Sequence, residues 1–261
     1  MSMNPKARSF EAWRAMSPVE AVETAYATIA SHGDDTIFIT LRDREDALLA
    51  ARKLEGEGAA GKPLFGLPFA VKDNIDVAGM PTTAACPDFA YTPEVSAHVV
   101  ALLEAAGAIA IGKTNLDQFA TGLVGVRSPY GVPKNTLRPD LVPGGSSSGS
   151  AVAVGAGIAA FSLGTDTAGS GRVPAALNGI VGLKPSLGLL SATGVVPACR
   201  TLDTISVFAA NAADAAQVAA VAAGFDAADF MSRSLPPAGI AAVPPVLRIG
   251  VPRQADRQFF G

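Results

Sequence analysis

Two serines lie in glycine-rich segments that could present a hydroxyl group for chemistry. Ser146 follows a pair of glycines in residues 143–150, PGGSSSGS, and Ser170 lies in residues 164–172, GTDTAGSGR. Paired glycines let a backbone approach a ligand closely, and the small residues before Ser170 leave N–H groups that could stabilise an oxyanion. Each segment alone also fits a plain role, as a linker or as an ordinary strand–turn–helix corner. The first segment lacks the Lys-Ser/Thr ending of a phosphate-binding loop.

A lysine at the end of an apolar run is the candidate base. Lys72 directly follows residues 67–71, LPFAV, which we predict to form a buried strand. Burying an ammonium group is costly, so a lysine at such a place is rarely structural. Its pKa would have to fall by ~3 from ~10.4 for the amine to be neutral near pH 7. The alternative is a lysine that reaches solvent from the strand end.

The two histidines of the chain are weak candidates for this base. A reactive serine needs an activating group, and His32 and His98 are the histidines available. His32 falls at the end of a predicted helix and His98 near the start of another, so neither has a strand-end or glycine-rich context. The residues therefore favour a serine–lysine device, which is a known variant of triad chemistry.

Predicted helices and short apolar strands alternate along the chain and would position these side chains. Such alternation favours an α/β fold whose mixed, largely parallel sheet is covered by helices on both faces. The predicted helices are 17–32, 43–54, 96–106, 149–157, 171–177 and 211–223, with a short helix capped by Asn115 and ending at Phe119. The predicted strands are 37–41, 67–71, 108–111, 159–163 and 247–251.

Composition and charge exclude several functional classes. The chain has 261 residues and is 49% hydrophobic, which is enough for a packed core. Its net charge of −3 argues against nucleic acid or an anionic membrane as a partner. Residues 141–165 carry no charge but are rich in Gly and Ser, so we predict a loop, a buried helix and a strand there, not a membrane span.

The numbers of cysteines and histidines limit which cofactors and which cellular compartment the sequence favours. Two Cys and two His without ligand spacing give no metal site, and we predict no cofactor. The first 12 residues contain no apolar run of the kind found in signal peptides. Two reduced thiols would then fit a cytoplasmic protein.

Taken together, Lys72, Ser146 and Ser170 resemble the pattern of the amidase signature family. That pattern joins a lysine at a strand end, a Gly-Gly-Ser-Ser loop and a Gly-Thr-Asp-x-Gly/Ala-Gly-Ser-x-Arg segment. The serines are 24 residues apart (170 − 146), the lysine precedes the second serine by 98 (170 − 72), and both spacings are similar to the family's. The resemblance covers roughly residues 17–251 and implies the amidase-signature fold, with 1–261 as the N-terminal part of that domain.

The resemblance assigns roles to the three side chains. It implies that Ser170 is the nucleophile, that Lys72 is a neutral base, and that Ser146 bridges them from a cis peptide.

The same resemblance implies roles for residues around the nucleophile. The backbone amides of Thr167, Ala168 and Gly169, continuing to that of Ser170, would form the oxyanion hole. Gly122 would contribute a backbone wall near the bound substrate. Arg172 would hold the nucleophile's loop together with Asp166, or would meet an anionic substrate.

Three further segments are similar to the allophanate-hydrolase branch of the family. They are residues 125–131, GVRSPYG, 174–178, PAALN, and 196–203, VPACRTLD. The implied reaction is hydrolysis of allophanate, a small-molecule amide, with release of ammonia, and the resemblance leaves room for a homodimer. Two alternatives remain open. One is an amidase of other specificity, such as an amidotransferase A-type subunit. The other is an inactive truncated fragment with an exposed sheet edge, because the family's catalytic domain continues beyond Gly261.

Overall fold

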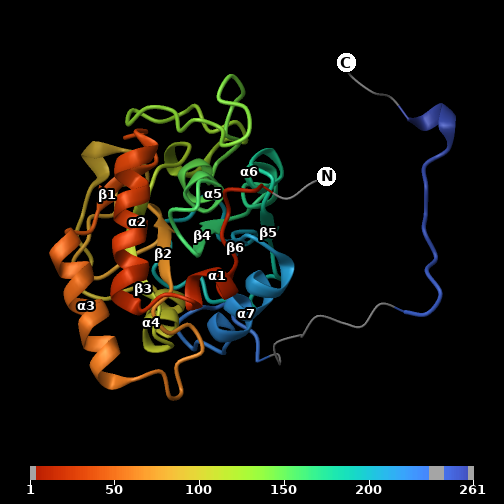
Figure 1. Ribbon diagram of the computed structural model, residues 1–261. Coiled ribbons are helices and arrows are strands. Elements are labelled where there is room, and N and C mark those ends of the chain that lie inside the picture. The colour runs from red at the N-terminus through yellow and green to blue at the C-terminus, as the bar shows by residue number, and fades with distance from the viewer. Residues whose placement is uncertain (1–3, 235–243, 258–261) are drawn as a thin grey trace.

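A six-stranded mixed sheet forms the centre of the molecule (Figure 1). The computed structural model describes residues 4–234 and 244–257. Across the sheet the strands follow the order β1-β3-β2-β4-β6-β5. Their bounds are β1 Phe38–Leu41, β2 Pro68–Lys72, β3 Ile109–Thr114, β4 Phe161–Thr165, β5 Val181–Leu183 and β6 Ile205–Ala209.

The central strands β3, β2 and β4 are parallel, β1 and β6 pair antiparallel to them on either side, and β5 pairs antiparallel to β6. Parallel strands bring their carboxyl ends to one edge of a sheet, where open α/β sheets bind ligands. Lys72, Thr114 and Thr165 end the three central strands and therefore lie at this edge. The predicted mixed α/β fold is confirmed, although β5 and β6 were not predicted.

Helices cover both faces of this sheet (Figure 1). Along β6, Phe208 packs with residues of α5 and α6, whereas Ile205 and Val207 belong to the core that α4 and α7 complete. Since successive strand residues point to opposite faces, these two helix pairs lie on opposite sides. The helices are α1 Phe10–Arg14, α2 Pro18–His32, α3 Arg44–Glu57, α4 His98–Ala105, α5 Ser148–Gly155, α6 Arg172–Leu177 and α7 Ala212–Ala222, with 3-10 turns η1 Pro87–Phe89, η2 Gln118–Ala120 and η3 Gln254–Asp256.

The uncharged segment 141–165 folds as predicted, into a loop followed by α5 and then β4. Every residue of α5 is buried. A Cβ on Gly149 would collide with the carbonyl of Ile37, so only a helix of small residues fits this close to the neighbouring backbone. None of the helices in the described residues is long and apolar enough to cross a membrane.

Two predicted elements are wrong. Residues 247–251 form no strand, and Leu247, Ile249 and Val251 are exposed. A short apolar run becomes a strand only where another strand offers its backbone for pairing. Asn115 does not cap a helix: its amide group donates to two backbone carbonyls of neighbouring loops, and the left-handed backbone of Phe119, with φ of 48°, leaves only the 3-10 turn η2.

Candidate active site

The Lys72 amine lies between two hydroxyl groups at the carboxyl edge of the sheet. Its Nζ donates to Ser146 Oγ at 2.8 Å and to Thr165 Oγ1 at 2.7 Å. Lys72 and Ser146 are fully buried, and Thr165 is nearly so. The candidate base therefore has fixed partners and does not reach solvent, which rules out the alternative of a solvated lysine.

Burial changes the protonation of this lysine. Loss of hydration lowers the pKa of Lys72 from its ordinary value to about 7, and the carboxylates of Asp117, Asp166 and Asp203 oppose part of that shift. An amine with this pKa is substantially neutral at physiological pH and can accept a proton.

Ser146 is held by a glycine-rich loop that wraps around Asp117. The peptide bond between Gly145 and Ser146 is cis, as the resemblance implied. The Ser146 carbonyl accepts a hydrogen bond from the Asp117 N–H at 3.0 Å. A Cβ on Gly145 would collide with the Asp117 carboxylate, which explains the glycine at this position.

Asp117 also fixes the loop that follows it. Its carboxylate accepts hydrogen bonds from the N–H groups of Gly125 at 3.0 Å and Arg127 at 2.8 Å. Asp117 was not among the residues predicted from the sequence, because it fell within the short helix expected from Asn115 to Phe119; the structure instead places it in the loop three residues after β3.

Ser170 lies at the turn between β4 and α6 and is 4% exposed. Its hydroxyl donates to the carbonyl of Gly122 at 3.4 Å. No hydrogen bond joins the Ser170 and Ser146 hydroxyls in the part of the chain that the structure describes. The structure thus pairs Lys72 with Ser146 directly, and it places Ser170 against the backbone wall expected at Gly122.

The turn that carries Ser170 closes around the buried carboxylate of Asp166. This carboxylate accepts hydrogen bonds from the N–H groups of Gly169, Gly171 and Arg172, at 2.8, 3.1 and 3.2 Å. The Arg172 guanidinium adds two parallel bonds, at 2.9 and 3.0 Å. Burial alone would raise the pKa of Asp166, but the bonds from Arg172 and the two glycine amides outweigh it and lower that pKa.

These contacts bear on two of the predicted roles, which stay predictions. The Gly169 amide donates to Asp166, whereas the amides of Thr167, Ala168 and Ser170 make no hydrogen bond within the described residues. Two guanidinium nitrogens of Arg172 bind Asp166, which fits the role of holding the loop, and the contact with an anionic substrate stays a prediction.

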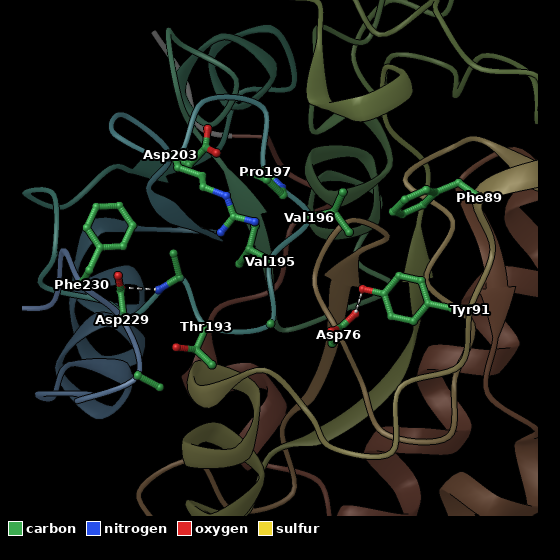
Figure 2. Close-up of a pocket in the computed structure, with 14 residues that line it drawn as sticks. Asp76, Phe89, Tyr91, Thr193, Val195, Val196, Pro197, Asp203, Asp229 and Phe230 are labelled. Atoms are coloured by element: carbon green, nitrogen blue, oxygen red, sulfur yellow. Dashed lines mark hydrogen bonds between the residues drawn. The ribbon is translucent and has the colours of Figure 1, made fainter.

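A cavity of about 470 Å³ lies beside this turn (Figure 2). Asp203, one of the residues that line it, accepts a hydrogen bond from the Thr167 hydroxyl and thereby joins the cavity wall to the turn. Aromatic side chains, Phe89, Tyr91 and Phe230, form part of the remaining wall. None of the three predicted catalytic residues lines this cavity. Within the described residues, no group of three or more His, Cys, Asp or Glu could hold a metal ion.

Thr165 is a partner of Lys72 that was not predicted from the sequence, and its removal should alter the base. We expect Thr165→Val to lower kcat by about 10-fold or more, because a buried amine that loses an acceptor costs ~1–3 kcal/mol. The lost bond also stabilised the charged amine, so the acidic limb of the pH–rate profile should move to lower pH. Steady-state kinetics measured across pH test both the fall in kcat and the shift of the acidic limb. If neither changed, Thr165 would have no role as a partner of the base. Thr204→Val, which removes a bond to a local carbonyl only, is the matched control.

The mixed α/β fold is that of the amidase-signature class of proteins. The sequence matches the family described as Amidase over residues 20–259, and the chain belongs to that family.

Individual relatives share this fold and much of the sequence. The chain is 58% identical over 193 residues to a urea amidolyase of Lachancea kluyveri, covering 74% of this chain and 10% of that protein. It is 43% identical over 249 residues to the A-type subunit of the glutamyl-tRNA(Gln) amidotransferase from Methanosarcina acetivorans, covering 94% of this chain and 51% of that protein. An allophanate hydrolase of Kluyveromyces lactis superposes with a TM-score of 0.81 at 48% identity, covering 88% of this chain and 39% of the other. The chain therefore spans between 10% and 51% of the length of these proteins.

Proposed function

We propose that the chain carries the catalytic serine–serine–lysine centre of an amidohydrolase that cleaves allophanate and releases ammonia. The observation that supports this most is the buried Lys72–Ser146 hydrogen bond of 2.8 Å, made by an amine whose pKa is lowered to about 7. A base of this pKa next to a serine relay is what activation of a second serine requires.

In the proposed mechanism the Ser170 hydroxyl turns from the Gly122 carbonyl towards Ser146. Ser170 Oγ attacks the amide carbon as its proton passes to Ser146 Oγ, and the Ser146 proton passes to Lys72 Nζ. The carbonyl oxygen becomes an oxyanion, which the free amides of the 167–170 turn stabilise. The C–N bond then breaks as the proton returns through Ser146 to the departing nitrogen, and water hydrolyses the acyl-enzyme.

The amide substrate is proposed from similarity. A urea amidolyase at 58% identity and an allophanate hydrolase at 48% rank above the amidotransferase subunit at 43%. The amidotransferase alignment covers more of this chain, 94%, which makes glutamine the second candidate substrate. We also propose that the chain forms a homodimer. A measurement of its molar mass in solution tests this.

Ammonia release from allophanate and from glutamine separates the two candidates. We expect the purified chain to release ammonia from allophanate with the higher kcat/KM. Preference for glutamine would replace the proposal with the second candidate.

An inactive fragment is the remaining alternative. A fluorophosphonate probe labels a serine only when that serine is activated. We expect labelling at Ser170, located by mass spectrometry of the digested protein. Lack of labelling together with lack of turnover would contradict the proposed function for this chain.

A further inference from the structure

A second buried lysine lies next to the candidate base and has no part in the proposed proton relay. Lys113 on β3 faces Asp73, the residue directly after Lys72, with Nζ 3.3 Å from Oδ1. Both side chains are fully buried. Strand β3 pairs with β2 so that Lys113 lies opposite Val71, which places this ion pair one step from the catalytic lysine.

Burying this ion pair has a cost in desolvation. Removing two charges from water costs several kcal/mol per ion, which a buried pair recovers only with full hydrogen bonding. Asp73 Oδ1 accepts no hydrogen bond within the described residues. Burial lowers the pKa of Lys113, and the attraction of Asp73 compensates this only in part. The hydrogen bonds that both side chains make to a neighbouring loop therefore offset part of this cost.

The pair binds the loop of residues 81–85 at four points. Lys113 Nζ donates to the Pro81 carbonyl at 3.0 Å and to Thr82 Oγ1 at 2.9 Å. Asp73 Oδ2 accepts from the N–H of Thr83 at 2.9 Å and from its hydroxyl at 2.5 Å. These bonds fasten the loop to the ends of the two central strands.

The fastened loop is strained and supports a second strained loop. Ala84 and Ala85 have left-handed φ values of 49° and 57°. The Ala84 carbonyl accepts from the N–H of Phe119 at 2.9 Å, and the Ala85 carbonyl accepts from the Gln118 side chain, also at 2.9 Å. Phe119 and Ala120 have φ values of 48° and 56°, so the non-glycine residues with positive φ in the described chain all belong to these two loops. Strained backbone of this kind persists only where its surroundings enforce it, and it concentrates at functional sites.

The second loop leads directly to the nucleophile. Two residues after Ala120, the carbonyl of Gly122 accepts the hydroxyl of Ser170. A continuous chain of contacts therefore runs from the buried ion pair through both loops to the wall of the active site.

We propose that Asp73 and Lys113 are positioning residues that fix the Gly122 carbonyl opposite Ser170, where it accepts the N–H of the scissile amide. This inference rests on the proposed amide hydrolysis. A carbonyl at that place distinguishes an amide from an ester, because only the amide has an N–H to donate. Loss of the ion pair should therefore harm amide hydrolysis more than ester hydrolysis.

The kinetic test compares two substrates with the same acyl group, 4-nitroacetanilide and 4-nitrophenyl acetate. In the double variant Asp73→Leu/Lys113→Met, apolar side chains replace the pair. We expect kcat/KM for the anilide to fall by about 10-fold or more while that for the ester falls by about 3-fold or less, as for one lost hydrogen bond in a buried site. Thr83→Val removes the hydroxyl bond to Asp73 and the bond that this hydroxyl accepts from the Ala85 N–H but keeps the ion pair, so it should change the ratio in the same direction by a smaller factor. Equal losses on both substrates would overturn the inference.

Hydrogen exchange gives a second readout that does not depend on turnover. Peptides covering residues 117–123 should exchange faster in the double variant and in Thr83→Val than in the wild-type chain, because the 81–85 loop no longer holds them. Val218→Ala, a truncation in the buried face of α7, is the control for a general loss of stability. Unchanged exchange at 117–123, or the same increase in the control, would overturn the inference. Absence of wild-type turnover on both substrates would instead count against the proposed function, and exchange would still decide the positioning role.

Discussion

Replacing Ser170 with alanine should abolish amide hydrolysis, with a fall in kcat of about 10⁶-fold, the loss found when a serine hydrolase loses its nucleophile. The proposed acyl-enzyme forms through Ser170 Oγ, and no other hydroxyl lies at the 166–172 turn except that of Thr167, which is bonded to Asp203. Fold stability should be almost unchanged, because the Ser170 hydroxyl makes a single long bond to the Gly122 carbonyl. Ammonia release and thermal melting measure the two effects.

The control for this variant is Ser148→Ala. Ser148 is also buried and lies close in sequence to Ser146, but its hydroxyl makes only a 3.4 Å bond to the Asn115 carbonyl. Its activity should stay within about 3-fold of the wild type. Substantial turnover in Ser170→Ala, at a level above a few per cent of the Ser148→Ala rate, would sink the assignment of the nucleophile.

Replacing Lys72 with methionine should lower kcat by about 10⁴-fold or more, because the serine relay loses its base. In the wild-type chain, kcat/KM should rise with pH through about 7. Below that pH the Lys72 amine is protonated and cannot accept a proton, and above it the neutral amine predominates. Between about pH 5 and about pH 9, kcat/KM of the wild-type chain should therefore show one rise, the acidic limb of the profile. The residual activity of Lys72→Met should lack this rise.

Lys53→Met is the matched control, since Lys53 lies on α3 with a side chain that is 78% exposed. It carries the same chemical change and should leave both kcat and the acidic limb unchanged. If the limb persisted in Lys72→Met, another group would have to be the base, and the proposed relay through Ser146 would fail.

The sequence was most informative where several weak signals coincided. Lys72, Ser146 and Ser170 each had a plain structural interpretation, and only their joint spacing favoured chemistry. Elements with strong local signals were also predicted well: helix α2 has the Ser17 capping box, the proline at its first position and the left-handed Gly33 that its sequence indicated.

What escaped prediction depends on contacts between distant parts of the chain. Thr165 lies 93 residues from the lysine it contacts, and nothing in its own segment distinguishes it from any strand-end threonine. Nothing in the sequence indicated that the Gly169 N–H has a partner. Only the folded turn brings the buried Asp166 carboxylate close enough to accept its hydrogen bond. The run 247–251 had the composition of a strand but lacks a strand to pair with in the described structure. Local pattern gives propensity, and tertiary contacts decide its outcome.

The depressed pKa of Lys72 couples folding to proton release. The unfolded chain would carry this lysine with its ordinary pKa of 10.5, whereas the folded chain holds it at about 7. Between these values the unfolded state binds more protons, so this group makes the fold more stable as pH rises through that window, and it is most destabilising below about pH 7. The cost there is on the order of 5 kcal/mol, a large share of the stability of an ordinary domain. The buried amine that makes the site reactive is therefore also a source of instability below about pH 7, which the rest of the fold must offset.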